Sequence, residues 1–182
     1  MPTCRSPTPF PEPVLRIATA ADAQNLAALA IQVWLHTYAT NGIRSAISQY
    51  VLTEFTAEAF MQKLNNTSLR LFVAEVNDHL VAYALVNLDA PCPTDASANV
   101  ELTTLYVQEH FGGVGLGSKL LSLSQGTARE RAVGSRLWLT ANAQNMWALA
   151  FYAKHRFVQA GTIPFGFGGE SHLNHILIEP CA

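Results

Sequence analysis

The stretch LYVQEHFGGVGLGSKLL, from Leu105 to Leu121, carries the strongest structural signal in the sequence. Its first residues are apolar β-formers that predict the end of a strand, and the segment from Leu116 to about Ala132 predicts a helix. Between them, glycines stand at the alternate positions Gly113, Gly115 and Gly117. Glycines let the backbone approach a ligand closely, and the first turn of the helix adds partial positive charge. This order of strand, glycine turn and helix predicts a site for a phosphate or diphosphate group.

Spacing separates this turn from two common phosphate-binding loops. A P-loop requires G-x-x-x-x-G-K-[ST], but Gly117 is followed by Ser118, so that Lys119 comes one position late and the magnesium-binding hydroxyl is missing. A dinucleotide fold requires G-x-G-x-x-G in a parallel βαβ unit, whereas the third glycine here comes one residue early and the strand follows a hairpin. Neither loop fits the sequence.

A third pattern fits, because the stretch resembles the signature L-Y-V-x-x-x-x-[QR]-G-x-G-[IL]-G-x-x-L-L of the GCN5-related N-acetyltransferases. One position departs from it: Gly112 stands where the family has Gln or Arg. The resemblance implies acetyl-coenzyme A as co-substrate, with its pantetheine arm along the strand edge at Leu105, Tyr106 and Val107. The backbone that would bind the diphosphate comprises Gly112, Gly113, Val114, Gly115, Leu116, Gly117 and Ser118.

A second block, LWLTANAQNMWALAFYAKHRF from Leu137 to Phe157, resembles the family's L-x-L-x-V-x-x-x-N-x-x-A-x-x-[FL]-Y-x-x-x-G-F. Asn145 is placed to cap a helix or to contact the coenzyme, and the sequence leaves both open. Tyr152 follows two turns later on the same helix face, and by resemblance it is the acid that protonates the departing thiolate. A phenol with a pKa of about 10 holds that proton at neutral pH. Arg156 occupies the place of a glycine that usually ends the helix.

Attack by an amine requires the amine to be neutral, so a base is expected near the end of the strand that leads to the glycine turn. Glu101 lies six residues before Val107, and alternation along a strand predicts that both side chains share one face. Thr103 and Leu105 would share that face, and partial burial there would raise the pKa of the carboxyl group. The alanine-terminus acetyltransferases look similar, with a glutamate at this place. A water-relayed proton is the alternative.

The acceptor is expected to contact the first helical region and the segment before the last strand. Trp34 and Tyr38 lie near the end of the first helix, and Phe167 belongs to a late glycine-rich segment, Phe165 to Glu170. These two segments loosely resemble family members that act on polyamines or small amines. We therefore expect an N-acetyltransferase that acts on a primary amine by direct transfer in a ternary complex. A peptide amino-terminus acetyltransferase and a non-catalytic acyl-coenzyme A sensor remain alternatives.

The fold class expected is α/β, or α+β, with a mixed, mostly antiparallel sheet flanked by helices. Helices are expected at Ala23 to about Tyr38, at Ile43 to Lys63 as one or two pieces, at Leu116 to about Ala132, and at Met146 to His155. Strands are expected at Val14–Ala18, Leu69–Val76, Leu80–Asn87, Val100–Val107, Arg136–Thr140, Phe157–Gly161 and His175–Ile178. Residues 69–87 should form a hairpin.

The amino-acid composition and net charge exclude several classes of binding partner. The 182 residues are 49% apolar and 13% charged, with a formal charge of -2, so wholesale disorder and nucleic-acid binding are not expected. The three cysteines are far apart in the sequence, which argues against a disulfide framework and against a metal site. We therefore expect a cytoplasmic protein. No membrane segment or export signal is predicted. We expect a proline-rich leader over 1–13 and a single domain over 14–182, and the late strands leave a homodimer open.

Overall fold

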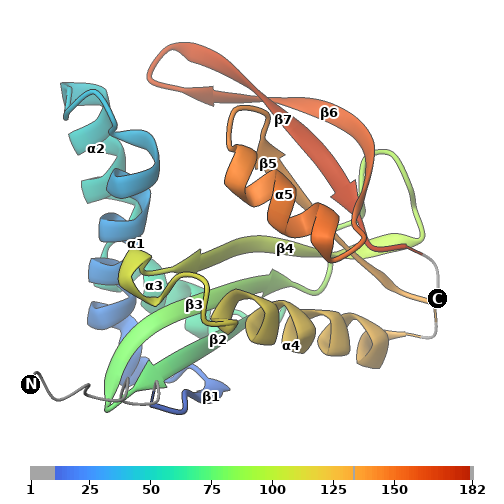
Figure 1. Cartoon of the computed structure of the whole chain (residues 1–182), viewed down its shortest axis with the longest axis horizontal. Helices are drawn as coiled ribbons and strands as arrows, with labels where there is room; N and C mark the ends of the chain where they lie inside the picture. Colours follow the sequence, from blue (N-terminus) through green and yellow to red (C-terminus); the bar gives the residue numbers. More distant parts are fainter. Residues whose placement is uncertain (1–10, 133, 181–182) are drawn as a thin grey trace, which may run out of the picture.

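A central mixed sheet organises residues 11–132 and 134–180, the part of the chain that the computed structural model describes (Figure 1). Its seven strands in this part are β1 (Val14–Ile17), β2 (Leu69–Val76), β3 (His79–Asn87), β4 (Ala98–Val107), β5 (Arg136–Asn142), β6 (Val158–Phe167) and β7 (Glu170–Ile178). They lie in the order β1-β2-β3-β4-β5-β7-β6. All neighbours are antiparallel except β4 and β5. The expected fold class is confirmed.

The helices flank this sheet. They are α1 (Ala23–Tyr38), α2 (Ser45–Glu54), α3 (Ala57–Asn65), α4 (Leu116–Arg131) and α5 (Met146–Lys154), with short 3-10 turns η1 (Ala20–Asp22) and η2 (Glu109–Phe111). The stretch expected over 43–63 consists of two helices, because Thr56 caps α3 by accepting a hydrogen bond from the amide of Ala59 at 3.1 Å. No helix in the described residues is long and apolar enough to cross a bilayer.

Two apolar layers hold the helices on opposite faces of the sheet. On one face, α4 and α5 pack against β2–β5 through residues such as Leu120, Leu102 and Tyr152. On the other, α1 and α3 pack against β2 and β3 through Leu26, Phe60 and residues of both strands. The sheet therefore has an α4–α5 face and an α1–α3 face, and these names are used below.

The last hairpin is longer than the sequence predicted. The strands expected at Phe157–Gly161 and His175–Ile178 continue outward as β6 and β7, and the segment expected to be a glycine-rich loop is largely strand. The turn is Gly168–Gly169, with φ of 61° and 80°. Because both turn residues take positive φ without steric cost, two glycines suffice to join the strands. Residues 1–10 of the expected leader lie outside the described residues, so that boundary stays a prediction.

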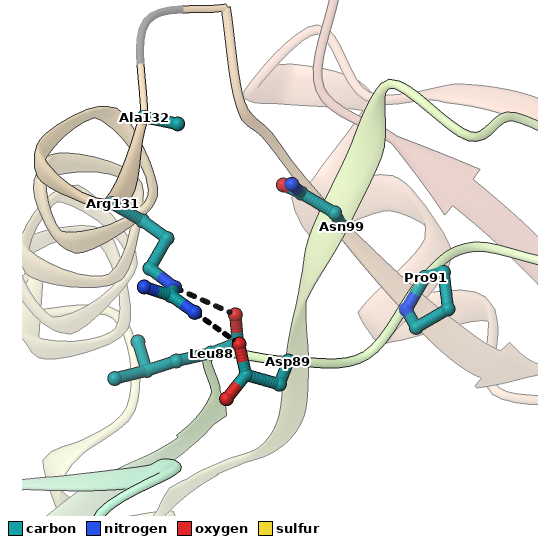
Figure 2. A pocket seen from close by; sticks show the side chains of 6 residues that line it. All are labelled: Leu88, Asp89, Pro91, Asn99, Arg131 and Ala132. Atoms are coloured by element: carbon teal, nitrogen blue, oxygen red, sulfur yellow. Dashed lines mark hydrogen bonds and ion pairs between the residues drawn. The ribbon is translucent and has the colours of Figure 1, made fainter.

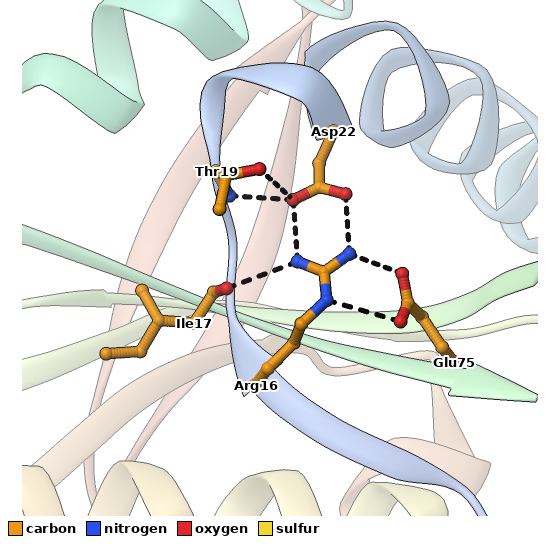
Figure 3. A network of polar contacts seen from close by, with 5 residues as sticks. All are labelled: Arg16, Ile17, Thr19, Asp22 and Glu75. Atoms are coloured by element: carbon orange, nitrogen blue, oxygen red, sulfur yellow. Dashed lines mark hydrogen bonds and ion pairs between the residues drawn. The ribbon is translucent and has the colours of Figure 1, made fainter. Parts of the chain in front are cut away.

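A charged network fixes the start of α1 to the sheet (Figure 3). The guanidinium of Arg16 on β1 donates to both carboxylate oxygens of Asp22 at 2.7 and 2.8 Å, and it also pairs with Glu75 on β2. Asp22 accepts a further hydrogen bond from the Thr19 amide at 2.7 Å. The Arg16 hydrogen bond is the main cause that lowers the pKa of the buried Asp22 carboxyl to about 2.

We predict that Asp22→Asn lowers the free energy of unfolding by about 1–3 kcal/mol at pH 7, because Arg16 loses its buried charged partner. The folded-state pKa of Asp22 lies below the unfolded value of about 3.9, so its stabilisation is complete above about pH 4 and is lost as the pH falls toward 2. Urea denaturation should show that the difference in free energy of unfolding between wild type and variant becomes smaller as the pH falls across this range. Glu75→Gln, at the more exposed carboxylate, should cost less. A constant difference from pH 6 to pH 2 would contradict this role.

Candidate active site

The pairing between β4 and β5 stops partway along both strands. Their parallel register runs from Ala98 opposite Arg136 to Glu101 opposite Trp138, and no pair follows in the described residues. β4 continues to Val107 with only β3 beside it, while β5 continues beside β7. One edge of β4 over residues 102–107 therefore has no neighbouring strand, and its backbone groups on that side are available to a ligand.

A β-bulge at Thr103 corrects the expected orientation of Glu101. Val86 pairs with Leu102 and the preceding Leu85 pairs with Thr104, so Thr103 is an extra residue in β4. The bulge reverses the alternation. Leu105 and Val107 pack with the α4–α5 face, whereas Glu101, opposite Asn87, shares the α1–α3 face with Tyr106, opposite Tyr83. Glu101 and Val107 thus lie on opposite faces, contrary to the prediction from simple alternation.

The glycine turn lies between β4 and α4, as the sequence predicted. Gly113 and Gly115 have φ of 78° and 88°, and Gly115 directly precedes α4. The first helical hydrogen bond runs from the Lys119 amide to the Gly115 carbonyl at 3.0 Å, so the amides of residues 116–118 precede the helical ladder. The exposed Val114 lies between the two glycines. Free amides and the helix dipole together make this turn suited to an anion.

Two glycines of the turn are constrained by close packing. A Cβ atom at Gly112 would lie 3.1 Å from the Glu109 carbonyl oxygen, so the turn is built around the small residue that replaces the usual Gln or Arg. At Gly117, a Cβ atom would touch the Phe151 ring at 3.4 Å, and glycine lets α4 approach α5 closely.

A contact that the sequence did not signal also joins these helices. The hydroxyl of Ser118 in the first turn of α4 lies 2.9 Å from Nε2 of His155 at the end of α5. His155 also stacks on Phe151, with ring centroids 4.7 Å apart. An imidazole therefore lies beside the glycine turn. It belongs to the second block, where nothing in the spacing links it to Ser118.

Asn145 caps α5, which confirms one of its two expected roles. Its side-chain oxygen accepts a hydrogen bond from the Ala148 amide at 3.0 Å. Burial raises the pKa of the Tyr38 phenol at the end of α1, and the nearby Asn145 side chain lowers it by a smaller amount. Asn145 thus lies close to the end of α1 as well as at the start of α5.

The end of α5 keeps its usual turn although Arg156 replaces glycine. Arg156 has φ of 65°, its amide donates to the Ala153 carbonyl at 2.9 Å, and the Phe157 amide donates to the Tyr152 carbonyl at 3.0 Å. These two bonds define a Schellman motif, and the rings of Tyr152 and Phe157 make its apolar contact at 5.7 Å. The departure at Arg156 leaves the position of Tyr152 intact.

Tyr152 is buried beside the open edge of β4. Its side chain is 8% exposed and packs in the same cluster as Leu105 and Val107. Burial raises the pKa of the phenol well above its ordinary value, and the nearby Tyr38 raises it further. The Tyr152 hydroxyl therefore stays protonated at any physiological pH.

The structure brings together the three aromatic residues expected at the acceptor side and adds a fourth. The ring of Trp34 lies 5.0 Å from that of Tyr38, 5.3 Å from that of Phe167, and 5.1 Å from that of Tyr50 on α2. We call Trp34, Tyr38, Tyr50 and Phe167 the aromatic wall. Tyr106 of β4 packs against the same cluster. Tyr50 was missed because α2 has only weak periodicity in the sequence.

Glu101 lies on this face of the sheet and is half-buried. Burial raises the pKa of its carboxyl above the usual value, and a hydrogen bond with the Thr103 side chain lowers it by a smaller amount. Because Thr103 is the extra residue of the bulge, Tyr106 lies four strand positions beyond Glu101, which corresponds to about 13 Å along β4. The carboxylate therefore lies on the acceptor side, set back from the aromatic wall.

Two hollows border β4. A cavity of about 130 Å³ lies where α1 meets the end of β4, and Val33, Thr37 and Val107 are among its lining residues. A wider surface hollow of about 410 Å³ lies near the start of β4, beside Asn99 (Figure 2). Arg131, which lines this hollow, is at the end of α4, whereas the glycine turn precedes the start of that helix. Arg131 already pairs with Asp89 and donates to the Leu88 carbonyl. Within the described residues no cluster of three or more His, Cys, Asp or Glu side chains could hold a metal ion.

Known proteins share both the sequence pattern and the fold. Residues 28–157 match the model of the Acetyltransferase (GNAT) family. An uncharacterized N-acetyltransferase of Mycobacterium tuberculosis (strain H37Rv) is 26% identical over 159 residues, which cover 87% of this chain and 97% of the relative.

Solved structures share the fold. The PaiA N-acetyltransferase of Thermoplasma acidophilum, in complex with coenzyme A, superposes with a TM-score of 0.68 at 18% identity, covering 90% of this chain and 98% of that one. A GCN5-related N-acetyltransferase of Rhodopseudomonas palustris gives a TM-score of 0.69 at 18% identity, covering 96% and 99%. The chain therefore belongs to the acetyltransferase (GNAT) family and is an N-acetyltransferase.

Proposed function

We propose that this enzyme moves the acetyl group of acetyl-coenzyme A to a primary amine by direct transfer in a ternary complex. The observation that carries the proposal is the continuity of two backbone features. The unpaired edge of β4 runs through η2 into the glycine turn, whose amides precede the helical ladder of α4. An extended amide-bearing arm fits the first feature, and a diphosphate fits the second. The coenzyme A bound to the Thermoplasma protein supports the same co-substrate here.

Each of these two backbone features would bind a different part of the coenzyme. The Gly112 amide, predicted as a ligand, already donates to the Glu109 carbonyl at 2.8 Å. The amides from Gly113 to Ser118 would therefore hold the diphosphate, with the helix dipole in place of the missing Gln or Arg side chain. The edge at Leu105, Tyr106 and Val107 would hold the pantetheine arm, and an N–H near Val107 would stabilise negative charge on the thioester oxygen. Asn145 would border the arm from the start of α5.

Tyr152 serves as the general acid. When the thioester C–S bond breaks, the proton on the phenol oxygen moves to the departing sulfur, and this prevents a free thiolate from attacking the product. The raised pKa keeps Tyr152 protonated until that step, and its apolar surroundings exclude water that would compete. Acid catalysis of this kind contributes about 10²–10⁴-fold.

Glu101 serves as the general base, directly for a long acceptor or through a relay of water molecules. Its carboxylate lies on the acceptor side of the sheet, where it can take the proton that the ammonium group must lose before the amine attacks. The spacing of about 13 Å along β4 favours the water-relayed form, because only a long acceptor reaches directly from the wall to Glu101. The sensor alternative is less favoured, since the turn at Arg156 and the position of Tyr152 are both preserved.

We predict that the enzyme releases free coenzyme A from acetyl-coenzyme A only when a primary amine is present, and that Tyr152→Phe cuts kcat at least about 10²-fold without weakening acetyl-coenzyme A binding. The variant keeps the ring and its packing but has no proton to donate. A thiol reagent follows the release, mass spectrometry identifies the acetylated amine, and calorimetry measures binding.

Tyr83→Phe is the matched control. Tyr83 is also a buried tyrosine, but it packs against Phe60 on the α1–α3 face, so kcat should stay within about twofold of wild type. Equal losses in both variants would show that Tyr152 acts through packing alone. Binding without thiol release in the wild type, with every amine tried, would instead establish a sensor.

Glu101→Gln should lower kcat/KM by about 10²-fold or more, because the amide cannot accept the proton. In the wild type, kcat/KM should rise with pH through the raised pKa of Glu101, since only the carboxylate is active. Thr103→Val removes the hydrogen bond that lowers this pKa, and the acidic limb of the pH profile should then move to higher pH. Two results together would remove Glu101 as the base. Thr103→Val would leave the pH profile of kcat/KM unchanged, and Glu101→Gln would lower kcat/KM less than tenfold.

A further inference from the structure

The glycine turn lacks the long polar side chain that the family signature places there. Gly112 stands at that position, and its amide is already bonded to the Glu109 carbonyl. A Cβ atom at Gly112 would lie 3.1 Å from the same carbonyl oxygen, so the turn has little room for a larger residue. A diphosphate at this turn therefore lacks one side-chain donor, unless another part of the chain supplies it.

The end of α5 brings a side chain to this place. Gly117, in the first turn of α4, has its Cβ position 3.4 Å from the Phe151 ring, so the two helices approach closely there. Four residues after Phe151, Nε2 of His155 lies 2.9 Å from the hydroxyl of Ser118. Ser118 also carries one of the amides that precede the helical ladder of α4. Its hydroxyl therefore lies at the place assigned to the diphosphate.

A ring contact and the end of the helix hold His155 in position. Its imidazole lies against the Phe151 ring, with centroids 4.7 Å apart, and its amide donates to the Phe151 carbonyl at 3.2 Å. His155 and Ser118 are both partly exposed, so the pair is not closed off from a ligand. A pair that is ordered in advance loses little conformational entropy when a ligand binds.

The direction of this hydrogen bond decides what the pair can bind. A hydroxyl group has one proton to donate. When Ser118 donates it to Nε2 of His155, the serine oxygen offers only lone pairs, which repel a phosphate. When His155 carries a proton on Nε2 and donates to Ser118, the Ser118 hydroxyl can donate to a phosphate oxygen. An anion at the turn therefore favours the second arrangement.

The charged side chains next to the pair also suit an anion. Lys119, Lys154 and Arg156 are neighbours of the pair in the sequence, and all three are exposed. The acidic residue before the turn is Glu109, and its carboxylate lies 3.4 Å from Nδ1 of His36 on α1. The residues that directly adjoin the pair are thus cationic, which favours the approach of a negatively charged group.

We propose that His155 is a positioning residue for coenzyme A, which donates from Nε2 to the Ser118 hydroxyl while Ser118 donates to an oxygen of the diphosphate. The pair takes the part of the Gln or Arg side chain that is absent at Gly112. This proposal rests on the proposed binding of coenzyme A at the glycine turn, and it adds two side chains to the backbone amides assigned there. His155 acts on binding and not on the transfer of the acetyl group.

The test measures binding of coenzyme A by calorimetry and the transfer rates with acetyl-coenzyme A and acetylpantetheine. We expect His155→Leu to raise the Kd of coenzyme A and the KM of acetyl-coenzyme A about tenfold, with kcat within about twofold. His155→Gln, whose amide can donate from a similar position, should recover most of the affinity. With acetylpantetheine, which has no diphosphate, His155→Leu should change kcat/KM by less than about twofold.

A double variant tests whether His155 acts through Ser118. Ser118→Ala alone should raise the Kd of coenzyme A about tenfold, and adding His155→Leu should raise it no further. Dephospho-coenzyme A keeps the diphosphate but lacks the 3′-phosphate, so it should show the same losses. Thr127→Val is the matched control, because it removes a hydroxyl that bonds to the Leu123 carbonyl at 3.0 Å, farther along α4. Its Kd should match that of the wild type.

Several outcomes would overturn the role of His155. Additive losses in the double variant would show that the two side chains act separately. Equal losses with acetylpantetheine and acetyl-coenzyme A would reduce the contact to helix packing. Losses with coenzyme A but not with dephospho-coenzyme A would assign the pair to the 3′-phosphate. Unchanged Kd in both single variants would remove this proposal alone, whereas a wild type that binds no coenzyme A would remove the proposed function as well.

Discussion

The short parallel pairing of β4 and β5 is the constraint on which the rest of the site depends. After Glu101 and Trp138 the strands separate, and β5 continues as a partner of β7. The separation frees one edge of β4, and the cluster that contains Tyr152 and Phe151 packs beside that edge with Leu105 and Val107. A fully paired sheet would satisfy the same backbone groups internally and would leave nothing for a ligand to bind.

The sequence was informative where local chemistry decides the structure. Gly113 and Gly115 take the positive φ that glycine favours, Asn145 caps a helix, which is one of its two predicted roles, and the helix predicted from Ala23 to about Tyr38 is α1. It failed where nonlocal contacts decide. A bulge at Thr103 leaves no mark in the sequence, yet it moved Glu101 to the opposite face from Val107. The lengths of β6 and β7 depend on mutual pairing, and the contact of Ser118 with His155 depends on how α4 and α5 meet.

In the proposed mechanism, the two faces of the sheet have different roles. The α4–α5 face supplies a dry environment for the phenol of Tyr152, and the α1–α3 face presents Glu101 and the aromatic wall. All five tyrosines of the chain lie near this boundary. Burial raises the pKa of Tyr106 well above its ordinary value, and the neighbouring Tyr83, Tyr38, Tyr50 and Tyr152 raise it further. Phenols that stay neutral give this region polar contacts without buried charge, which suits a reaction that must move one proton to sulfur and remove another from nitrogen.

Amide hydrogen exchange with and without coenzyme A tests the central claim most directly, because the claim concerns backbone groups that have no partner in the free enzyme. The account predicts that coenzyme A slows amide exchange in residues 103–107 and 113–118. Exchange in α3, which packs on the α1–α3 face, should stay unchanged. Coenzyme A that binds, as shown by calorimetry, while exchange at both segments stays the same would contradict the assignment of the β4 edge and the glycine turn as its site.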